Sequence, residues 1–135
     1  MRIAFGTDEH TLLTEAIVTA LAGRGHEVVL LADPAPWPDA GRAVGSAIAA
    51  GSADLGVVCC WTGTGVSIAA NHAGPSVRAA LCTDAETARG ARRWNDANVL
   101  ALSLRLITEA VAGEILDAFL TTPPDETERP NIGRC

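Results

Sequence analysis

The sequence has few aromatic residues and no tyrosine, since only 4% of its 135 residues are aromatic. Its core must therefore consist mainly of Ala, Val, Leu and Ile, which suits close packing of helices on a sheet. Hydrophobic residues make up 48% and charged residues 19%, a globular rather than a disordered composition. The length suits a single domain.

The chain also lacks an excess of basic residues and long apolar runs. Its formal net charge is −6, and no basic stripe is present, so we expect no nucleic-acid partner. No run of 18 apolar residues exists, so we expect no membrane span. The opening "MRIAFGTDEH" turns polar after a short apolar run, unlike a signal peptide. These absences favour a cytoplasmic protein.

The cysteines and histidines do not form a recognisable metal-binding or disulfide pattern. There is no Cys-x-x-Cys, and two of the four cysteines are adjacent. The three histidines are not spaced as metal ligands. Apolar surroundings predict buried free thiols in a reducing compartment, and no metal or cofactor. The cysteines are Cys59, Cys60, Cys82 and Cys135.

Apolar runs alternate five times with segments of helical periodicity. The runs have no period of two, which is typical of strands buried on both faces of a parallel sheet. The sequence thus predicts an α/β fold, a three-layer α/β/α sandwich with a five-stranded parallel sheet of Rossmann-like type. We expect one domain over residues 1–122 and a tail over 123–135 that packs on a partner subunit or frays. The expected strands are 2–6, 26–32, 54–60, 77–82 and 98–103; the expected helices are 11–24, 40–53, 64–74, 84–94 and 108–122; three prolines predict a loop over 33–39.

The segment "CCWTGTG" follows the third predicted strand and leads into a helix. Ligands of such sheets lie beyond the carboxyl ends of the strands. Gly63 and Gly65 allow close backbone approach, and the free N–H groups of a helix start can hold a phosphate or an oxyanion. The Lys of a Walker loop is missing. By itself this turn is equally consistent with a structural junction.

Cys60 makes a chemical role more specific, because a helix N-terminus favours a thiolate, which can act as base or nucleophile. The alternative is that both cysteines are small buried residues. For Cys59 we expect a place in the core, because neighbouring strand residues face opposite ways. For Cys60, position alone leaves both interpretations open.

Three segments resemble the ribose-5-phosphate isomerase B and galactose-6-phosphate isomerase family. "CWTGTGVSIAAN" is similar to its Cys-Gly-Thr-Gly-x-Gly-x-Ser-Ile-Ala-Ala-Asn segment. "VRAALCTD" with "ARRWNDANVLALSLR" is similar to a second signature that normally reads Ser-Arg-x-His-Asn-Asp-Ala-Asn-Val-Leu. "IAFGTDEH" is similar to its opening Gly-x-Asp-His. The resemblance covers roughly the whole chain in register.

The resemblance implies a metal-independent aldose–ketose isomerase that acts on a phosphorylated sugar through a cis-enediolate. It also implies a homodimer with its sites between subunits. Cys60 matches the proton-transfer base, and Thr62 matches a hydroxyl that helps to move protons between oxygens. Asp8 matches a residue of the opening loop of the site. Further matches are the cradle for the enediolate oxygen (Gly63, Thr64 and Gly65), a substrate-binding serine (Ser67), an amide contributed across the dimer (Asn95), a phosphate ligand (Arg105) and two tail arginines (Arg129 and Arg134).

The departures from the family pattern concentrate at the implied site. Glu9 stands where the family has a histidine, with His10 one residue later, and Trp94 stands where it has another. Trp61 replaces a glycine next to the catalytic Cys. The family histidines are tied to opening of the sugar ring and to phosphate contact, and Trp94 offers one weak donor only. We therefore expect ring opening to be lost unless His10 compensates, and Trp61 and Trp94 either line an altered pocket or, for Trp61, pack in the core or at the dimer interface.

Three hypotheses follow for the function. The first is an isomerase for a phosphorylated sugar that needs no ring opening, such as a tetrose 4-phosphate. The second is a family member without isomerase activity that binds a sugar-like ligand or serves as a subunit. The third is a redox or thiol-transfer protein built on Cys59 and Cys60, although vicinal cysteines form strained disulfides.

Overall fold

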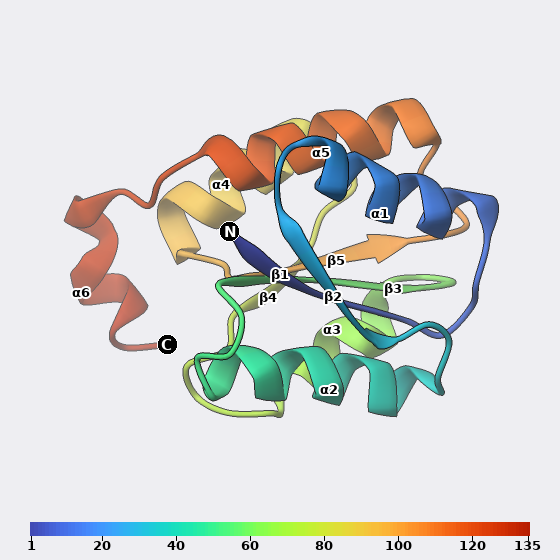
Figure 1. The fold of residues 1–135 in the computed structure, drawn as a ribbon. Coiled ribbons are helices and arrows are strands. Elements are labelled where there is room, and N and C mark those ends of the chain that lie inside the picture. The colour runs from blue at the N-terminus through green and yellow to red at the C-terminus, as the bar shows by residue number, and fades with distance from the viewer.

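The computed structural model describes every residue from Met1 to Cys135. Its parallel sheet has five strands in the order β2-β1-β3-β5-β4 (Figure 1). The strands are β1 (Arg2–Thr7), β2 (Glu27–Ala32), β3 (Leu55–Cys60), β4 (Ala79–Leu81) and β5 (Val99–Ser103). The helices are α1 (Leu12–Gly23), α2 (Trp37–Ala49), α3 (Thr64–Asn71), α4 (Ala85–Asn95), α5 (Glu109–Thr121), the 3-10 turn η1 (Glu126–Glu128) and α6 (Arg129–Ile132).

Helices cover both faces of the sheet, which confirms the predicted α/β/α sandwich. α1, α4 and α5 lie on one face, and α2 and α3 lie on the other (Figure 1). Each face has its own apolar core. Cys59 belongs to the core under α1, α4 and α5, whereas Cys60 belongs to the core under α2 and α3. The alternation of the strand therefore separates the two thiols, as the sequence predicts.

The sheet is buried on both faces only at its centre. Every residue of β3 and β5 is buried, as is all of β1 beyond its first residue. The prediction of full burial is wrong for the outer strands β2 and β4, which are only partly covered. Leu30 and Leu31 of β2 are exposed, because an edge strand has a neighbour on one side only.

Three of the six α-helices begin with a side chain that accepts a hydrogen bond from their first turn. Thr11 caps α1 in a reciprocal capping box with Thr14. Asp84 accepts from Thr87 N–H at the start of α4, and Thr108 accepts from Val111 N–H at the start of α5. None of the helices combines the length and apolar character that crossing a membrane requires.

Two segments differ from the predictions. α2 begins at Trp37, inside the predicted loop 33–39, with Pro36 as its N-cap and Pro38 in its first turn. Proline is tolerated there because the first N–H groups of a helix have no intrahelical acceptor. The tail, which the sequence predicts to pack on a partner subunit or to fray, is partly helical. It forms η1 and α6, and Asp125 N–H donates to the carbonyl of Arg93 at 2.8 Å.

Candidate active site

The carboxyl ends of β1 and β3 meet where the strand order reverses. The chain leaves β1 toward β2 on one side, and β3 lies on the other side of β1. In α/β sheets, ligands bind at such a switch point because the two connections diverge there. Asp8 follows β1 directly, and its N–H donates to the carbonyl of Cys59 in β3 at 3.2 Å. The loop after β1 and the end of β3 are thereby joined.

Cys60 is the last residue of β3 and faces the start of α3. The N–H of Gly63 donates to Cys60 Sγ at 3.2 Å. Gly63, the N-cap of α3, has a positive φ of 78° and provides no side-chain cap, in contrast to α1, α4 and α5. The N–H of Thr64 donates to Thr62 Oγ1 in a long hydrogen bond of 3.4 Å, and apart from this contact no side chain caps the first N–H groups of α3. This arrangement places positive potential beside the sulfur and above the helix start.

Gly63 is also required for space. A Cβ added there would lie 2.5 Å from Leu81 Cδ1 and 3.0 Å from the carbonyl carbon of Leu102. Both neighbours belong to adjacent strands, β4 and β5. The turn between Cys60 and α3 is therefore pressed onto the sheet, which keeps its N–H groups close to the strand ends.

Cys59 is placed for packing only. It is fully buried, and burial raises the pKa of its thiol far above the usual range. Burial also raises the pKa of Cys82 to about 12. All four cysteines are free thiols, and Cys135, unlike the others, is exposed. A redox couple of Cys59 and Cys60 would need both sulfurs to react, and one of them has no access to solvent.

Hydroxyl groups and one free guanidinium surround the turn after Cys60. The hydroxyls of Thr62 and Thr64 lie 2.7 Å apart. The carbonyl of Trp61 accepts from Ser103 Oγ at 2.9 Å and from Arg105 N–H at 3.1 Å, so the ends of β3 and β5 are held together. Arg105 forms no ion pair with a carboxylate and is free to bind an anion. The remaining candidate of this segment, Ser67, lies one turn into α3 and is half-buried.

Trp61 is 60% exposed, which rules out the alternative that it packs in the core and leaves a pocket wall or the dimer interface as the predictions for it. Its carbonyl holds the loop through Ser103 and Arg105, while its side chain forms no hydrogen bond. A glycine at this position would leave the carboxyl-end edge of the sheet open. The exposed indole therefore adds apolar surface next to Cys60 and Thr62.

His10 and Asp8 have different environments within the loop after β1. His10 Nε2 lies 2.8 Å from Glu15 Oε1, and its Nδ1 lies 2.9 Å from Asp33 Oδ1. These two carboxylates raise the pKa of His10 and favour the imidazolium. Asp8 Oδ1 is buried and has no hydrogen-bond partner. Burial, together with the neighbouring Glu9, raises the pKa of Asp8.

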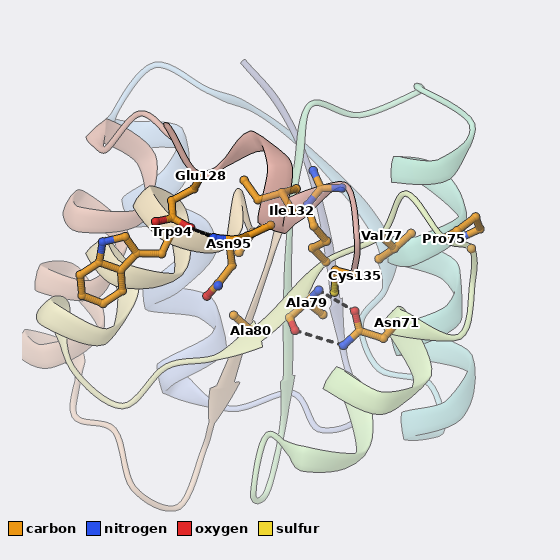
Figure 2. A pocket seen from close by; sticks show the side chains of 14 residues that line it. Asn71, Pro75, Val77, Ala79, Ala80, Trp94, Asn95, Glu128, Ile132 and Cys135 are labelled. Carbon is orange, nitrogen blue, oxygen red and sulfur yellow. Dashed lines mark hydrogen bonds between the residues drawn. The ribbon is translucent and has the colours of Figure 1, made fainter. Parts of the chain in front are cut away.

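The other predicted site residues lie at the opposite end of the sheet. Trp94 and Asn95 end α4, ahead of β5, whereas Cys60 pairs with Ser103 at the far end of β5. The length of β5 alone corresponds to roughly 16 Å of extended chain. Figure 2 shows Trp94 and Asn95 beside the tail, where a groove of about 590 Å³ lies between the end of α4, β4 and α6.

The carboxylate of Asp96, directly after α4, holds the tail at the amino-end edge of the sheet through Arg129. Asp96 accepts from Arg78 at 3.2 Å, from Arg92 at 3.3 Å and from Arg129 at 2.9 Å. Arg129 is also paired with Glu126 at 3.0 Å. Arg134 has no carboxylate partner and is exposed. Of the two tail arginines, Arg134 is thus the one whose charge is free.

The structure therefore brings the predicted residues together in two groups rather than one. Trp61 and Trp94 cannot line a single pocket within one chain. The carboxyl-end group contains Asp8, His10, Cys60, Trp61, Thr62, Gly63, Thr64, Gly65, Ser67 and Arg105; the amino-end group contains Trp94, Asn95, Arg129 and Arg134.

Sequence reasoning missed Trp37 in the carboxyl-end group. Its indole packs on Gly65, where an added Cβ would lie 2.9 Å from Trp37 Cε3 and 3.0 Å from Cδ2. The ring is 45% exposed. A tryptophan between two prolines, directly after the carboxyl end of a strand, is a signal that could have marked it. The prolines instead led to the prediction of a loop.

This architecture defines a class of site. It combines a thiol at a switch point, an uncapped helix start that can stabilise an anion, and nearby hydroxyls, which suits acid–base chemistry on a small anionic molecule. No cluster of three or more His, Cys, Asp or Glu side chains is arranged to hold a metal ion. The Ribose/Galactose Isomerase family matches residues 3–132, and the chain belongs to that family.

Individual relatives agree with this assignment. The chain is 38% identical over 127 residues to ribose-5-phosphate isomerase B of Escherichia coli, an alignment that covers 88% of this chain and 83% of the relative. It is 42% identical over 84 residues to galactose-6-phosphate isomerase subunit LacB of Clostridium acetobutylicum, covering 62% of this chain and 48% of that relative. The solved structure of ribose-5-phosphate isomerase B from Clostridium thermocellum superposes with a TM-score of 0.91 at 36% identity, over 99% of this chain and 94% of that one.

Proposed function

We propose that the protein isomerises an aldose phosphate and the corresponding ketose phosphate through a cis-enediolate, with Cys60 as the base that transfers the proton. The observation that carries this proposal is the hydrogen bond from Gly63 N–H to Cys60 Sγ at the uncapped start of α3, in a member of a sugar isomerase family. It puts the base and the anion cradle within one turn of each other.

The reaction asks for two things that this arrangement supplies. A proton must leave one carbon and return to the neighbouring carbon on the same face, which one thiolate can do. The negative charge that develops on the enediolate oxygen must be stabilised by donors already in place. The N–H groups at Thr64 and Gly65 serve as these donors. The paired hydroxyls of Thr62 and Thr64 move protons between the two sugar oxygens.

A complete site requires two copies of the chain. Asn95 and Arg134 lie at the amino-end edge of the sheet and cannot reach Cys60 of their own chain. In a symmetric dimer the same two surfaces meet twice, so each chain can complete the other's site. We infer that Asn95 and the tail arginine Arg134 bind the substrate at the partner's Cys60, with Arg105 binding the phosphate from the same chain.

The preferred substrate does not need its ring opened. Both ring nitrogens of His10 are held by carboxylates, so His10 does not exchange protons with a furanose, and Trp94 cannot accept a proton. A tetrose 4-phosphate cannot form a furanose, because its terminal oxygen carries the phosphate. Loss of ring opening by the family histidines then has no consequence for turnover.

A panel of aldose phosphates tests this proposal. We expect isomerisation of a tetrose 4-phosphate, or of a modified sugar that stays open, and weak or no turnover of ribose 5-phosphate. Rapid isomerisation of ribose 5-phosphate at ordinary enzyme levels would contradict the proposed substrate class. It would leave the role of Cys60 intact, so the two parts are tested separately.

A second candidate is a sugar-binding relative without isomerase activity. The exposed indole of Trp61, where the family has glycine, and the replacement of both histidines favour it. Uptake of solvent deuterium into the sugar distinguishes the two, because exchange reports enediolate formation even when turnover is slow. Exchange supports the isomerase, whereas tight binding without exchange for every sugar supports the binder.

A further inference from the structure

The contact between α2 and α3 is unusually close. A Cβ added at Gly41 would lie 2.6 Å from the carbonyl oxygen of Val66, and one at Gly45 would lie 2.5 Å from the carbonyl oxygen of Ala70. The backbones of the two helices therefore nearly touch along this seam. Such a contact gives α3 little freedom to move relative to α2.

Trp37 lies at the end of this contact, beside the first turn of α3. It lies one turn before Gly41 on the same side of α2, since residues four apart share a helix face. Its ring rests on Gly65, in the first turn of α3, with ring atoms 2.9 to 3.4 Å from the place of a Cβ. One side of the indole is thus packed on the backbone of the anion cradle. The rest of the ring, 45% of the residue's surface, is exposed.

The position of the indole is set by its surroundings. Pro36 and Pro38 on either side restrict the backbone, and the carbonyl of Pro36 accepts from Asp39 N–H and Ala40 N–H at 2.9 Å each. Gly65 behind the ring leaves no space into which it could retreat. A ligand that contacts this ring does not have to order it first, which lowers the cost of binding.

We propose that Trp37 forms an apolar wall of the substrate site and limits the size of the sugar that the site accepts. This inference rests on the proposed function. The cradle N–H groups and the threonine hydroxyls occupy one side of a bound sugar phosphate, and the indole offers its flat face to the carbon–hydrogen side. Because the wall cannot retreat, a longer carbon chain has less room than a short one.

Kinetics with Trp37→Ala and Trp37→Phe test the proposal on aldose phosphates of increasing chain length. We expect Trp37→Ala to raise KM for the best substrate about tenfold while kcat changes by less than about threefold, because the lost contact is made equally in ground and transition states. The variant should also shift kcat/KM toward longer sugars. Trp37→Phe should fall between. The control Leu30→Ala, an exposed apolar residue of β2, should change neither constant.

A second measurement does not depend on the alanine variant folding. Acrylamide quenching of tryptophan fluorescence is measured in the wild type and in Trp37→Phe, with and without the best substrate. We expect the substrate to protect fluorescence in the wild type and to protect less in Trp37→Phe. Full protection in Trp37→Phe, or an unchanged KM in both variants, overturns the inference.

Deuterium exchange separates this inference from the proposed function. If exchange proceeds and the Trp37 variants keep wild-type KM and chain-length preference, Trp37 is no wall and the isomerase proposal stands. If no aldose phosphate exchanges deuterium, the proposed function fails and the inference fails with it.

Discussion

The two ends of the sheet differ in chemistry, and in the proposed function they supply complementary halves of one site. At the carboxyl ends of β1 and β3 lie the thiol of Cys60, the start of α3 and the half-buried Asp8 with its unpaired Oδ1. At the amino ends lie Asn95 and the tail with Arg134, where Asp96 ties three arginines together. The first end has groups suited to proton transfer and charge stabilisation. The second has groups suited to holding an anion.

In the proposed site, residues from both edges of the sheet are therefore combined, because neither edge alone supplies all of them. The carboxyl end is rigid because its turn is pressed onto the sheet at Gly63. The amino end is held by ion pairs on an otherwise exposed tail. Damage to the first end should therefore abolish chemistry or folding, whereas damage to the second should weaken binding.

The largest effect is expected at Cys60. Cys60→Ala removes the base and should lower the rate of deuterium exchange into the sugar by about 10²- to 10⁴-fold. Cys59→Ala is the matched control, because it removes a neighbouring buried thiol that faces the other core. A loss of exchange with Cys59→Ala but not with Cys60→Ala would show that Cys59 rather than Cys60 is needed. That result would contradict the proposal and favour the redox hypothesis.

Gly63→Ala should break the rigidity of the carboxyl end. The substitution places a Cβ at a residue with positive φ, where it would press against Leu81 and Leu102. We therefore expect the free energy of unfolding to fall by about 3 kcal/mol and activity to be lost. Gly51→Ala is the control, since Gly51 has a φ of 72° but open space around it. It should cost about 1 kcal/mol from backbone strain alone. Equal costs in denaturant titrations would show that the turn is not pressed onto the sheet.

The two tail arginines should respond differently. Arg134→Ala should raise KM about tenfold with unchanged stability, because its free charge is available to the phosphate. Arg129→Ala should lower the free energy of unfolding slightly, because Glu126 loses its cation and Asp96 keeps only Arg78 and Arg92 as partners. Steady-state kinetics and thermal melts check both. A stability loss confined to Arg134→Ala would reverse these roles.

The smallest effect is expected for Asp8→Asn. The pKa of Asp8 is raised by burial, so the folded state prefers the neutral acid, and ionisation destabilises the protein as the pH rises above the usual pKa of an aspartate. Asp8→Asn should raise Tm by a few degrees at pH 7, with a gain that shrinks toward pH 4, while activity falls. A gain that is independent of pH would contradict an unpaired carboxylate at this site.

The sequence predicts those features of the fold and the site that depend on local pattern, but not those that depend on how closely the elements pack. The alternating apolar runs predicted the sandwich, and the opposite facing of Cys59 and Cys60 followed from strand geometry. The start of α2 was missed because prolines at a first turn resemble loop prolines. The separation of Asn95 from Cys60 follows from topology, but the packing of Trp37 on Gly65 depends on how closely α2 and α3 approach, which no local pattern encodes.

Mixing two inactive variants tests the central claim most directly. Cys60→Ala and Asn95→Ala chains are refolded together in equal amounts and assayed at a substrate concentration below KM, where weakened binding leaves Asn95→Ala nearly inactive alone, as Cys60→Ala is. If each site takes Cys60 from one chain and Asn95 from its partner, half of the dimers will be mixed, each with one intact site, and about one quarter of the wild-type activity will return. If both residues had to come from the same chain, no mixed dimer could contain an intact site, and the mixture would stay inactive.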